Sequence, residues 1–245
     1  MWPFRRKPLL DAAAARWHLD NFAWLIRNHG QRSRFAGARL VLPSQDFFAT
    51  DGLEGHALAV KLFEQVKAYS GMGEADIALR PAGSPPSRLG MPEVTYAAET
   101  LGHPQSLIAA LAHELAGHLL ATGTGEAPPI GPQGEEHLTD LTAVYFGFGV
   151  FLANSAFNMQ THADGWSYSR QGYLPEQDLI FALAIFLVVK QLDPEPALHY
   201  LKAELGGMLR RALRDLQSYK SEVAAMRLAS SGLPKQPGPR PSVVT

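Results

Sequence analysis

The sequence contains no cysteine among its 245 residues. That absence excludes a disulfide scaffold, a thiol nucleophile, an iron–sulfur cluster and every zinc site with thiolate ligands. A bound metal ion would therefore need histidine, aspartate or glutamate ligands. The chain has nine histidines, so any metal site must be sought among them and the acidic residues.

Charged residues are also scarce, at 18% of the chain, and the net charge is −1. A charged fraction below the usual value of about 25% indicates a well-buried globular protein. A net charge this small gives no broad field to attract nucleic acid. Residues 1–40 carry eight Lys or Arg against two Asp, but these are spread around a predicted helix and a loop. We therefore expect a solvated surface there and no nucleic-acid partner.

Long hydrophobic runs are missing as well. The most apolar stretch, residues 179–189, covers eleven positions, whereas a membrane-spanning helix needs about 20. We expect this stretch to form a buried core helix. The basic residues near the N-terminus are followed by Asp11 rather than by the apolar region of a signal peptide. The sequence thus predicts a cytoplasmic protein with no membrane partner.

Hydrophobic periodicity predicts a mainly helical α+β fold. Short strands with a small antiparallel sheet are expected at 39–43, 75–80 and 93–98, and residues 159–174 are expected to form a polar loop or hairpin. We expect one domain over residues 1–228 and a flexible Pro-rich tail over 229–245. The expected helices lie at residues 9–28, 53–69, 104–120, 135–157, 175–192, 194–205 and 207–228.

Residues 111–120 place ionisable side chains within an otherwise apolar helix, Leu-Ala-His-Glu-Leu-Ala-Gly-His-Leu-Leu. In the zincin motif HExxH, two histidines one turn apart bind zinc and the glutamate acts as general base. Here His113 and His118 are five positions apart, which is roughly 140° around a regular helix. A π-bulge at Gly117 would bring the two imidazoles back to one side.

The next predicted helix supplies carboxylates. Glu136 and Asp140 are four positions apart and share a helix face. We expect Glu136 to complete a zinc site with His113 and His118, leaving an open position for water. Asp140 would then accept the second ring N–H of a ligating histidine. His137 is an alternative to Glu136 as ligand, and the acids would also suit a helix N-terminus through the helix dipole.

The paired motifs HExxGH and EExxxD, over residues 113–140, resemble the signature of the dipeptidyl-peptidase III family. The resemblance implies zinc ligands His113, His118 and Glu136. It also implies that Glu114 is the general base and Asp140 a supporting acid.

The arrangement is also similar to the broader gluzincin pattern of a His-Glu helix followed by a Glu-x-x-x-Asp helix. The strand expected at 93–98 suits this similarity, because zincins bind the substrate backbone along an edge strand. The chain further resembles a group of uncharacterised bacterial HExxH-type proteins. That resemblance implies that Gly117 occupies the place of the second histidine, which would make the site a shifted or degenerate version.

The sequence therefore predicts a small antiparallel sheet packed on a zincin-like helix and a following glutamate helix. The expected function is a zinc metallopeptidase-like hydrolase of a peptide or protein substrate, in which Glu114 takes the proton of a zinc-activated water. The alternative is a catalytically inactive zinc-binding or metal-free scaffold that binds a partner. Candidates for the oxyanion donor that such a hydrolase needs lie in the polar loop, at His162, Tyr168, Arg170 and Tyr173.

Overall fold

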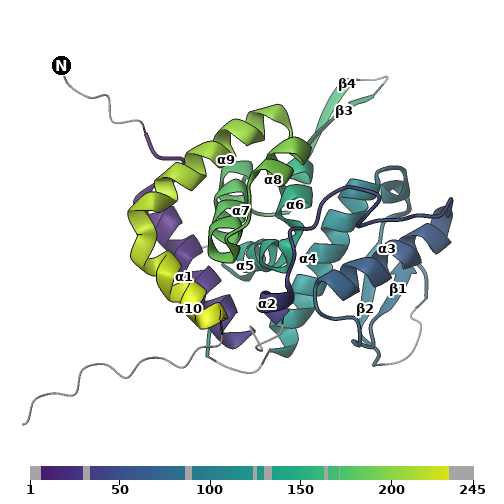
Figure 1. The fold of residues 1–245 in the computed structure, drawn as a ribbon. Helices are drawn as coiled ribbons and strands as arrows, with labels where there is room; N and C mark the ends of the chain where they lie inside the picture. Colours follow the sequence, from purple (N-terminus) through teal and green to yellow (C-terminus); the bar gives the residue numbers. More distant parts are fainter. Residues whose placement is uncertain are drawn as a thin grey trace, which may run out of the picture.

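Helices make up most of the structure, a computed structural model of the whole chain (Figure 1). It describes residues 7–29, 34–85, 90–123, 126–129, 134–162, 165–170 and 172–231, with the backbone alone described in the ranges 157–162 and 165–170. The prediction of a mainly helical protein is confirmed. Most of the tail expected over 229–245 lies outside the described residues.

The apolar run of the sequence forms α7 (Glu176–Lys190), and every residue from 179 to 187 is buried. Other helices pack around α7 and bury it. The prediction of a core helix is confirmed. In the described parts of the chain, no helix combines the length and the apolar character needed to cross a membrane. Helices packed on α7 include α1 (Ala12–Asn28), α6 (Gly149–Ser155), α9 (Ala203–Asp215) and α10 (Lys220–Ser230).

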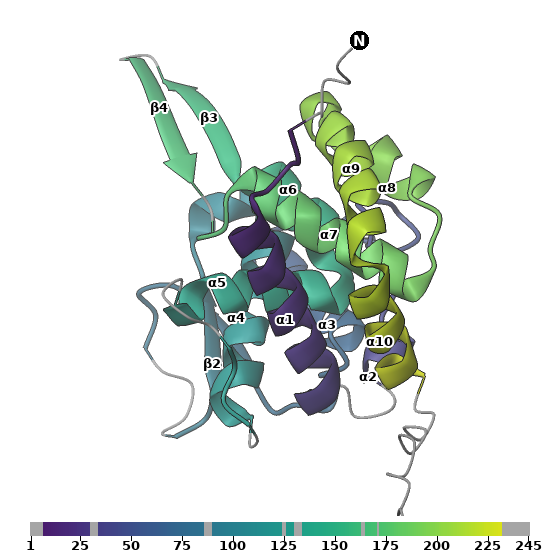
Figure 2. The ribbon, with the colours of Figure 1, turned by 90° about the vertical axis from the view of Figure 1, so that its left-hand side faces the viewer.

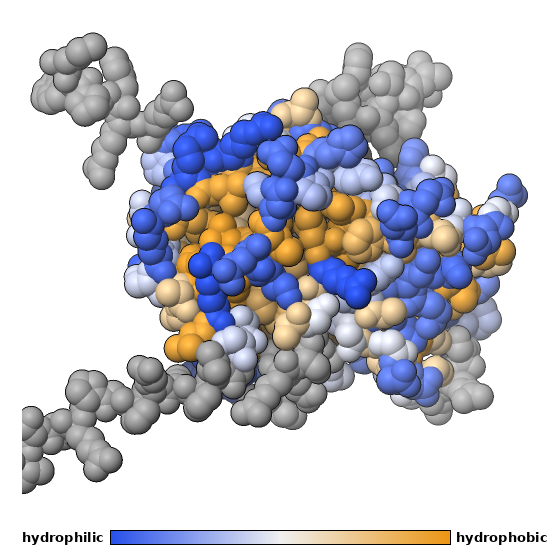
Figure 3. Space-filling view, in the orientation of Figure 1, coloured by the Kyte–Doolittle hydropathy of each residue, from blue (hydrophilic) through white to orange (hydrophobic). Residues whose placement is uncertain are grey.

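The C-terminal helices cover one side of α7. After α8 (Glu195–Tyr200), α9 turns Leu205, Leu209 and Ala212 inward, while Arg210 and Arg214 are exposed. The 3-10 helix Leu216–Tyr219 connects α9 to α10. Figure 3 shows the resulting surface, with hydrophilic residues along the rim formed by these helices and an apolar area beside it.

The small sheet near the N-terminal half is parallel, so the prediction of an antiparallel sheet is wrong. Strand β1 (Ala78–Pro81) pairs with β2 (Glu93–Tyr96), with Leu79 opposite Val94. Alternation along a strand does not specify the direction of its partner. The connection over residues 82–92 is long enough to return the chain to the same end, whereas a tight turn would have imposed antiparallel pairing.

An antiparallel pair occurs elsewhere. Strands β3 (Phe157–His162) and β4 (Gly165–Arg170) form a hairpin that projects from the helical body in both views (Figures 1 and 2).

The strand expected at 39–43 does not form, because Val41 donates its backbone N–H to Gly147 O at 3.0 Å rather than to a strand.

Helix α4 (Pro104–Thr122) lies between two layers. On one side it packs against β2, α3 (Gly55–Tyr69) and the 3-10 helix Ala98–Gly102, and on the other against α5 (Gly134–Ala143) and α6. The short helix α2 (Arg34–Gly37) lies near the end of α7, where Lys190 Nζ donates to Phe35 O at 2.9 Å. Helix α4 thus joins the sheet to the helical core.

The long helix expected over 135–157 is broken into α5, a π-helix (Val144–Phe148) and α6. The break falls at Gly147, whose φ is +107°. A Cβ on Gly147 would lie 1.9 Å from Arg39 O, so only glycine allows this close approach of the two backbones. The π-helix of this protein therefore follows α5 and is not part of α4, the helix that carries His113 and His118.

Candidate functional site

Helix α4 carries both histidines of the motif and is an α-helix throughout, without a π-bulge. The π-bulge at Gly117 that would bring the two imidazoles to one side of the helix does not form. A Cβ at Gly117 would lie 3.7 Å from Thr139 Cγ2, so α4 and α5 meet there in ordinary contact. In a regular helix, His113 and His118 point roughly 140° apart. Gly117, one turn after His113, shares its side of the helix.

His113 and Asp140 form the contact at the centre of the site. Asp140 Oδ1 lies 2.8 Å from His113 Nδ1, across the interface of α4 and α5. Asp140 is only 1% exposed, and its Oδ2 accepts the backbone N–H groups of Tyr173 at 2.6 Å and Leu174 at 2.7 Å. The carboxylate is therefore fixed from three directions. This fixes the orientation of the imidazole and leaves Nε2 as the ring nitrogen able to bind a metal ion or a substrate.

The surroundings of His113 favour its charged form. Burial lowers the pKa of the imidazole, but the hydrogen bond and charge of Asp140, with the charges of Glu114 and Glu136, outweigh this effect. The pKa of His113 is therefore raised above its ordinary value. Three carboxylates act on one half-buried imidazole, whose side chain is 25% exposed.

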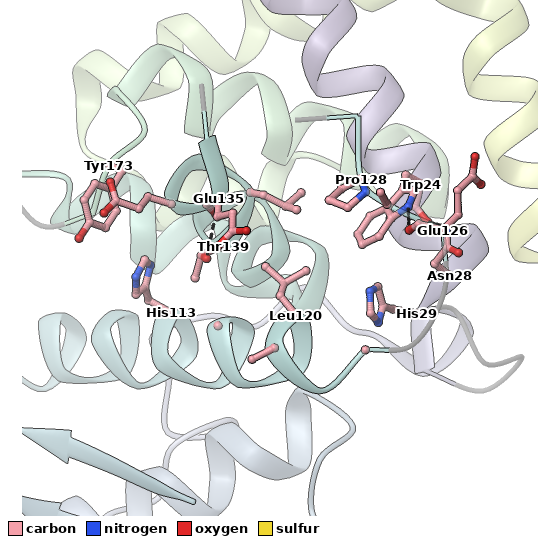
Figure 4. A pocket seen from close by; sticks show the side chains of 16 residues that line it. Trp24, Asn28, His29, His113, Leu120, Glu126, Pro128, Glu135, Thr139 and Tyr173 are labelled. Atoms are coloured by element: carbon pink, nitrogen blue, oxygen red, sulfur yellow. Dashed lines mark hydrogen bonds between the residues drawn. The ribbon is translucent and has the colours of Figure 1, made fainter. Parts of the chain in front are cut away.

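His113 borders three adjoining hollows. The largest, of about 490 Å³, extends from His113 and Tyr173 at one end to Trp24 and His29 at the other (Figure 4). Its wall at the far end is held in place because Trp24 Nε1 donates to Glu126 O at 2.9 Å. Glu135 and Glu136, at the N-terminal end of α5, also line this cavity.

The other two hollows lie on the remaining sides of His113, and Glu114 borders both. One of about 360 Å³ has an apolar wall made by small and branched side chains, Ala109, Ala110, Leu152 and Leu179. The other, of about 310 Å³, lies against β2 and is lined by Glu93, Val94, His118 and Ala121. The site is thus a branched cleft with His113 at its junction.

The residues expected to bind zinc are divided between these hollows. Glu136 lines the large cavity together with His113, whereas His118 lines the hollow beside β2. Within the described ranges, no three His, Asp or Glu side chains are arranged to hold one metal ion. Of the expected ligands, His113, oriented by Asp140, and Glu136 border the same cavity. The structure does not bring His118 to them.

Two further residues considered in the sequence analysis, His137 and Tyr173, lie at defined places in the structure. His137 does not border the cleft, because its ring packs near Trp17 of α1, with the centroids 6.3 Å apart. Tyr173, one of the expected oxyanion donors, lies against His113 with the centroids 5.8 Å apart. The side chains of the other candidate donors, His162, Tyr168 and Arg170, lie outside the described part of the structure.

Sequence reasoning missed the residues that complete the cleft. The backbone N–H groups that hold Asp140 come from a segment 33 and 34 residues further along the chain. Trp24 of α1 and His29, which directly follows α1, line the far end. No local pattern in the sequence signals these contacts, because each depends on helices that meet only in the folded chain.

Comparison with protein-family models, with curated proteins and with solved structures finds no match for this chain.

Proposed function

We propose that the protein is a zinc-dependent hydrolase of peptide bonds with its site at His113. The observation that carries the proposal is the contact between His113 and Asp140. Histidines that bind metal usually donate their second ring nitrogen to a carboxylate, which fixes the tautomer and makes the ligand more basic. Asp140 meets this requirement, since it is buried and held by two backbone N–H groups. Helices α4 and α5 would then be the active-site helix and the glutamate helix of a zincin.

Two residues of the cleft would hold the metal ion. These are His113, through Nε2, and Glu136, which lies one turn before Asp140 and borders the same cavity as His113. Zinc bound there would polarise the scissile carbonyl and lower the pKa of a bound water. A catalytic zinc normally has three protein ligands. Because the proposed site would have two, we expect weaker binding than at a complete zincin site.

Glu114 and Tyr173 would supply the proton transfer and the oxyanion stabilisation that the reaction needs. Glu114 follows His113 directly, is exposed and borders two of the three hollows. Its carboxylate would accept the proton of the attacking water and deliver it to the leaving amine. The Tyr173 hydroxyl, beside His113, would donate a hydrogen bond to the oxyanion that forms as water adds to the carbonyl. Substrates would be peptides or unfolded protein segments that enter the branched cleft.

A second candidate function is peptide binding without catalysis. The observation that favours it is Gly117, which occupies the position one turn after His113 where a zincin has its second histidine. In this case the protein has the peptide-binding cleft but lacks a complete metal site. The two functions differ in what Glu114 does, because only a hydrolase needs its carboxylate to move a proton.

The Glu114→Gln variant separates the two functions. Zinc-loaded protein would be assayed with a pool of internally quenched fluorescent peptides, with Glu195→Gln on the exposed surface of α8 as control. We expect Glu114→Gln to reduce hydrolysis at least ~100-fold, as for loss of a general base, while zinc stays bound. Hydrolysis unchanged in Glu114→Gln would remove the mechanism. Absence of hydrolysis in the zinc-loaded wild-type protein would favour the binding function.

A further inference from the structure

The hairpin of β3 and β4 has two faces that differ in composition. Residues opposite each other in an antiparallel pair share a face, and successive residues of a strand alternate between faces. The register therefore assigns the large apolar and aromatic residues to one face, at Phe157, Met159, Thr161, Trp166, Tyr168 and Arg170. The positions of the other face are Asn158, Gln160, His162, Gly165, Ser167 and Ser169. We call these two sets of positions the aromatic face and the polar face of the hairpin.

The hairpin is attached to the rest of the protein at its root. Strand β3 follows α6 and packs against it, while β4 ends at Arg170, shortly before the buried Leu174. Asp140 Oδ2 holds the backbone N–H groups of Tyr173 and Leu174. Beyond this root, no other helix or strand of the described chain runs alongside the hairpin in either view (Figures 1 and 2). The hairpin thus has a fixed root and an outer part that these elements do not cover.

A hairpin with this composition needs a partner. Two strands alone are marginally stable in water, and an independent sheet requires a third strand or an apolar surface packed on one face. Apolar residues that alternate with polar ones are the pattern of strands with one buried face. The sequence of β3 and β4 therefore indicates that the aromatic face is covered by something outside this chain.

The charges of the hairpin favour a second copy of this chain over a lipid surface. Arg170, at the root, is the only Lys, Arg, Asp or Glu in the two strands. Segments that lie on membranes usually carry Lys and Arg on their polar side, and the polar face of this hairpin has neither. Beyond Arg170, two aromatic faces meet without charge repulsion, and a two-fold axis brings the same face of each copy together.

The size of the aromatic face suits a stable dimer. An aromatic side chain buries roughly 150–250 Å² when it is covered, so Phe157, Trp166 and Tyr168 together provide roughly 450–750 Å² per chain. Met159 adds to this area. A standard protein interface buries about 800 Å² per partner. The hairpin therefore comes close to the area that a specific interface between two copies requires.

We propose that the aromatic faces of two hairpins pack on each other and join two copies of this chain in a symmetric dimer. Each hairpin would cover the apolar residues of the other, in the way that two sheets pack face to face. The dimer is independent of the proposed zinc chemistry, because it uses only residues of β3 and β4.

The test compares variants that place the same charge on opposite faces of the hairpin. Interfaces of this size have Kd values from μM to pM, so sedimentation equilibrium of the wild-type protein at ~100 μM should give twice the chain mass of 26.7 kDa. Met159→Lys should raise the Kd of the dimer at least ~100-fold, because each copy would bury a charge in an apolar interface. Gln160→Lys, at the next position of β3 and on the polar face, is the matched control and should leave the Kd unchanged. Tyr168→Lys and Ser167→Lys repeat the comparison on β4, and circular dichroism checks that each variant is folded.

Wild-type protein that is monomeric at ~100 μM would overturn the inference. If that monomer sediments with vesicles of phosphatidylcholine and phosphatidylglycerol, the aromatic face binds lipid instead. A dimer whose Kd is the same in Met159→Lys and Tyr168→Lys as in wild type would also overturn it, because the interface would then lie elsewhere. Equal weakening by the polar-face variants would count against it too, since the contact would then involve the edges of the hairpin rather than its aromatic face.

Discussion

His113 and Asp140 lie 2.8 Å apart across the interface between α4 and α5, and Asp140 also holds the backbone of Tyr173 and Leu174. One buried carboxylate thus links three segments of the chain and orients the imidazole at the junction of the cleft. The contact contributes to stability, because a carboxylate with this many partners cannot be exchanged without leaving donors unpaired.

Replacing Asp140 by Asn should destabilise the protein. The Asn amide has one oxygen to accept hydrogen bonds, so it can pair with fewer of the three donors, which are His113 Nδ1 and the backbone N–H groups of Tyr173 and Leu174. Its NH2 group would face the donors that remain. We expect the free energy of unfolding to fall by about 2 kcal/mol, the usual cost of leaving buried polar groups unpaired. Urea denaturation followed by circular dichroism measures the change. The exposed residue Asp76 provides the control, and Asp76→Asn should have little effect. Equal stability of Asp140→Asn and wild type would show that the contact contributes little.

The raised pKa of His113 gives a pH dependence with a definite sign. In protein kept metal-free with a chelator, a folded-state pKa above the unfolded value of about 6.5 stabilises the folded state below that pH. This contribution is lost as the pH rises through the folded-state pKa. The stability advantage of wild type over His113→Gln should therefore shrink between pH 5.5 and pH 8.5. A difference that grows with pH would contradict the assigned direction.

Gly147 should tolerate no side chain. Its φ of +107° and the 1.9 Å approach of a Cβ to Arg39 O both oppose alanine, and the neighbouring atom is backbone. We expect Gly147→Ala to cost about 3 kcal/mol or more, the scale of a strained backbone combined with a steric clash. Gly207→Ala is the matched control, because that glycine lies in α9 with open space around it and should gain about 0.5–1 kcal/mol. Thermal unfolding of both variants provides the comparison.

Helix periodicity predicted the positions of α1, α3, α4 and α7 to within a few residues, because each has a continuous apolar face or is apolar all round. It failed where a single backbone contact decides the structure. The segment 135–157 has helical periodicity, yet Gly147 breaks it to meet Arg39 O. Strand direction was missed for a similar reason, since it depends on the path of the connection rather than on the pattern of Glu93–Tyr96.

For the site, the spacing of Glu136 and Asp140 identified the face that meets His113, because side chains four apart on a helix share a face. The position of His118 could not be settled in the same way. A regular helix and a bulged helix are both compatible with the residues 113–118, and the choice between them became visible only in the folded structure, where the helix is regular. The raised pKa of His113 also requires the three-dimensional arrangement of its acidic neighbours.

Gly117→His should strengthen metal binding. The position lies one turn after His113 on the same side of α4, and a Cβ there would meet nothing closer than 3.7 Å. A histidine would supply the third protein ligand that zincin sites use. We expect zinc affinity to rise at least ~10-fold in isothermal titration, since one added ligand contributes more than 1.4 kcal/mol. Ala121→His, one further turn along α4, is the control and should not change the affinity. An unchanged affinity in Gly117→His would argue against a metal position between α4 and α5.

Zinc binding at His113 is tested by the zinc content of wild type and His113→Ala after equilibrium dialysis, determined by mass spectrometry. We predict one zinc ion per wild-type chain and none in His113→Ala, because the proposed site would hold the metal through His113 Nε2. Zinc retained at one ion per chain in His113→Ala, or no zinc bound by the folded wild-type protein, would contradict the account.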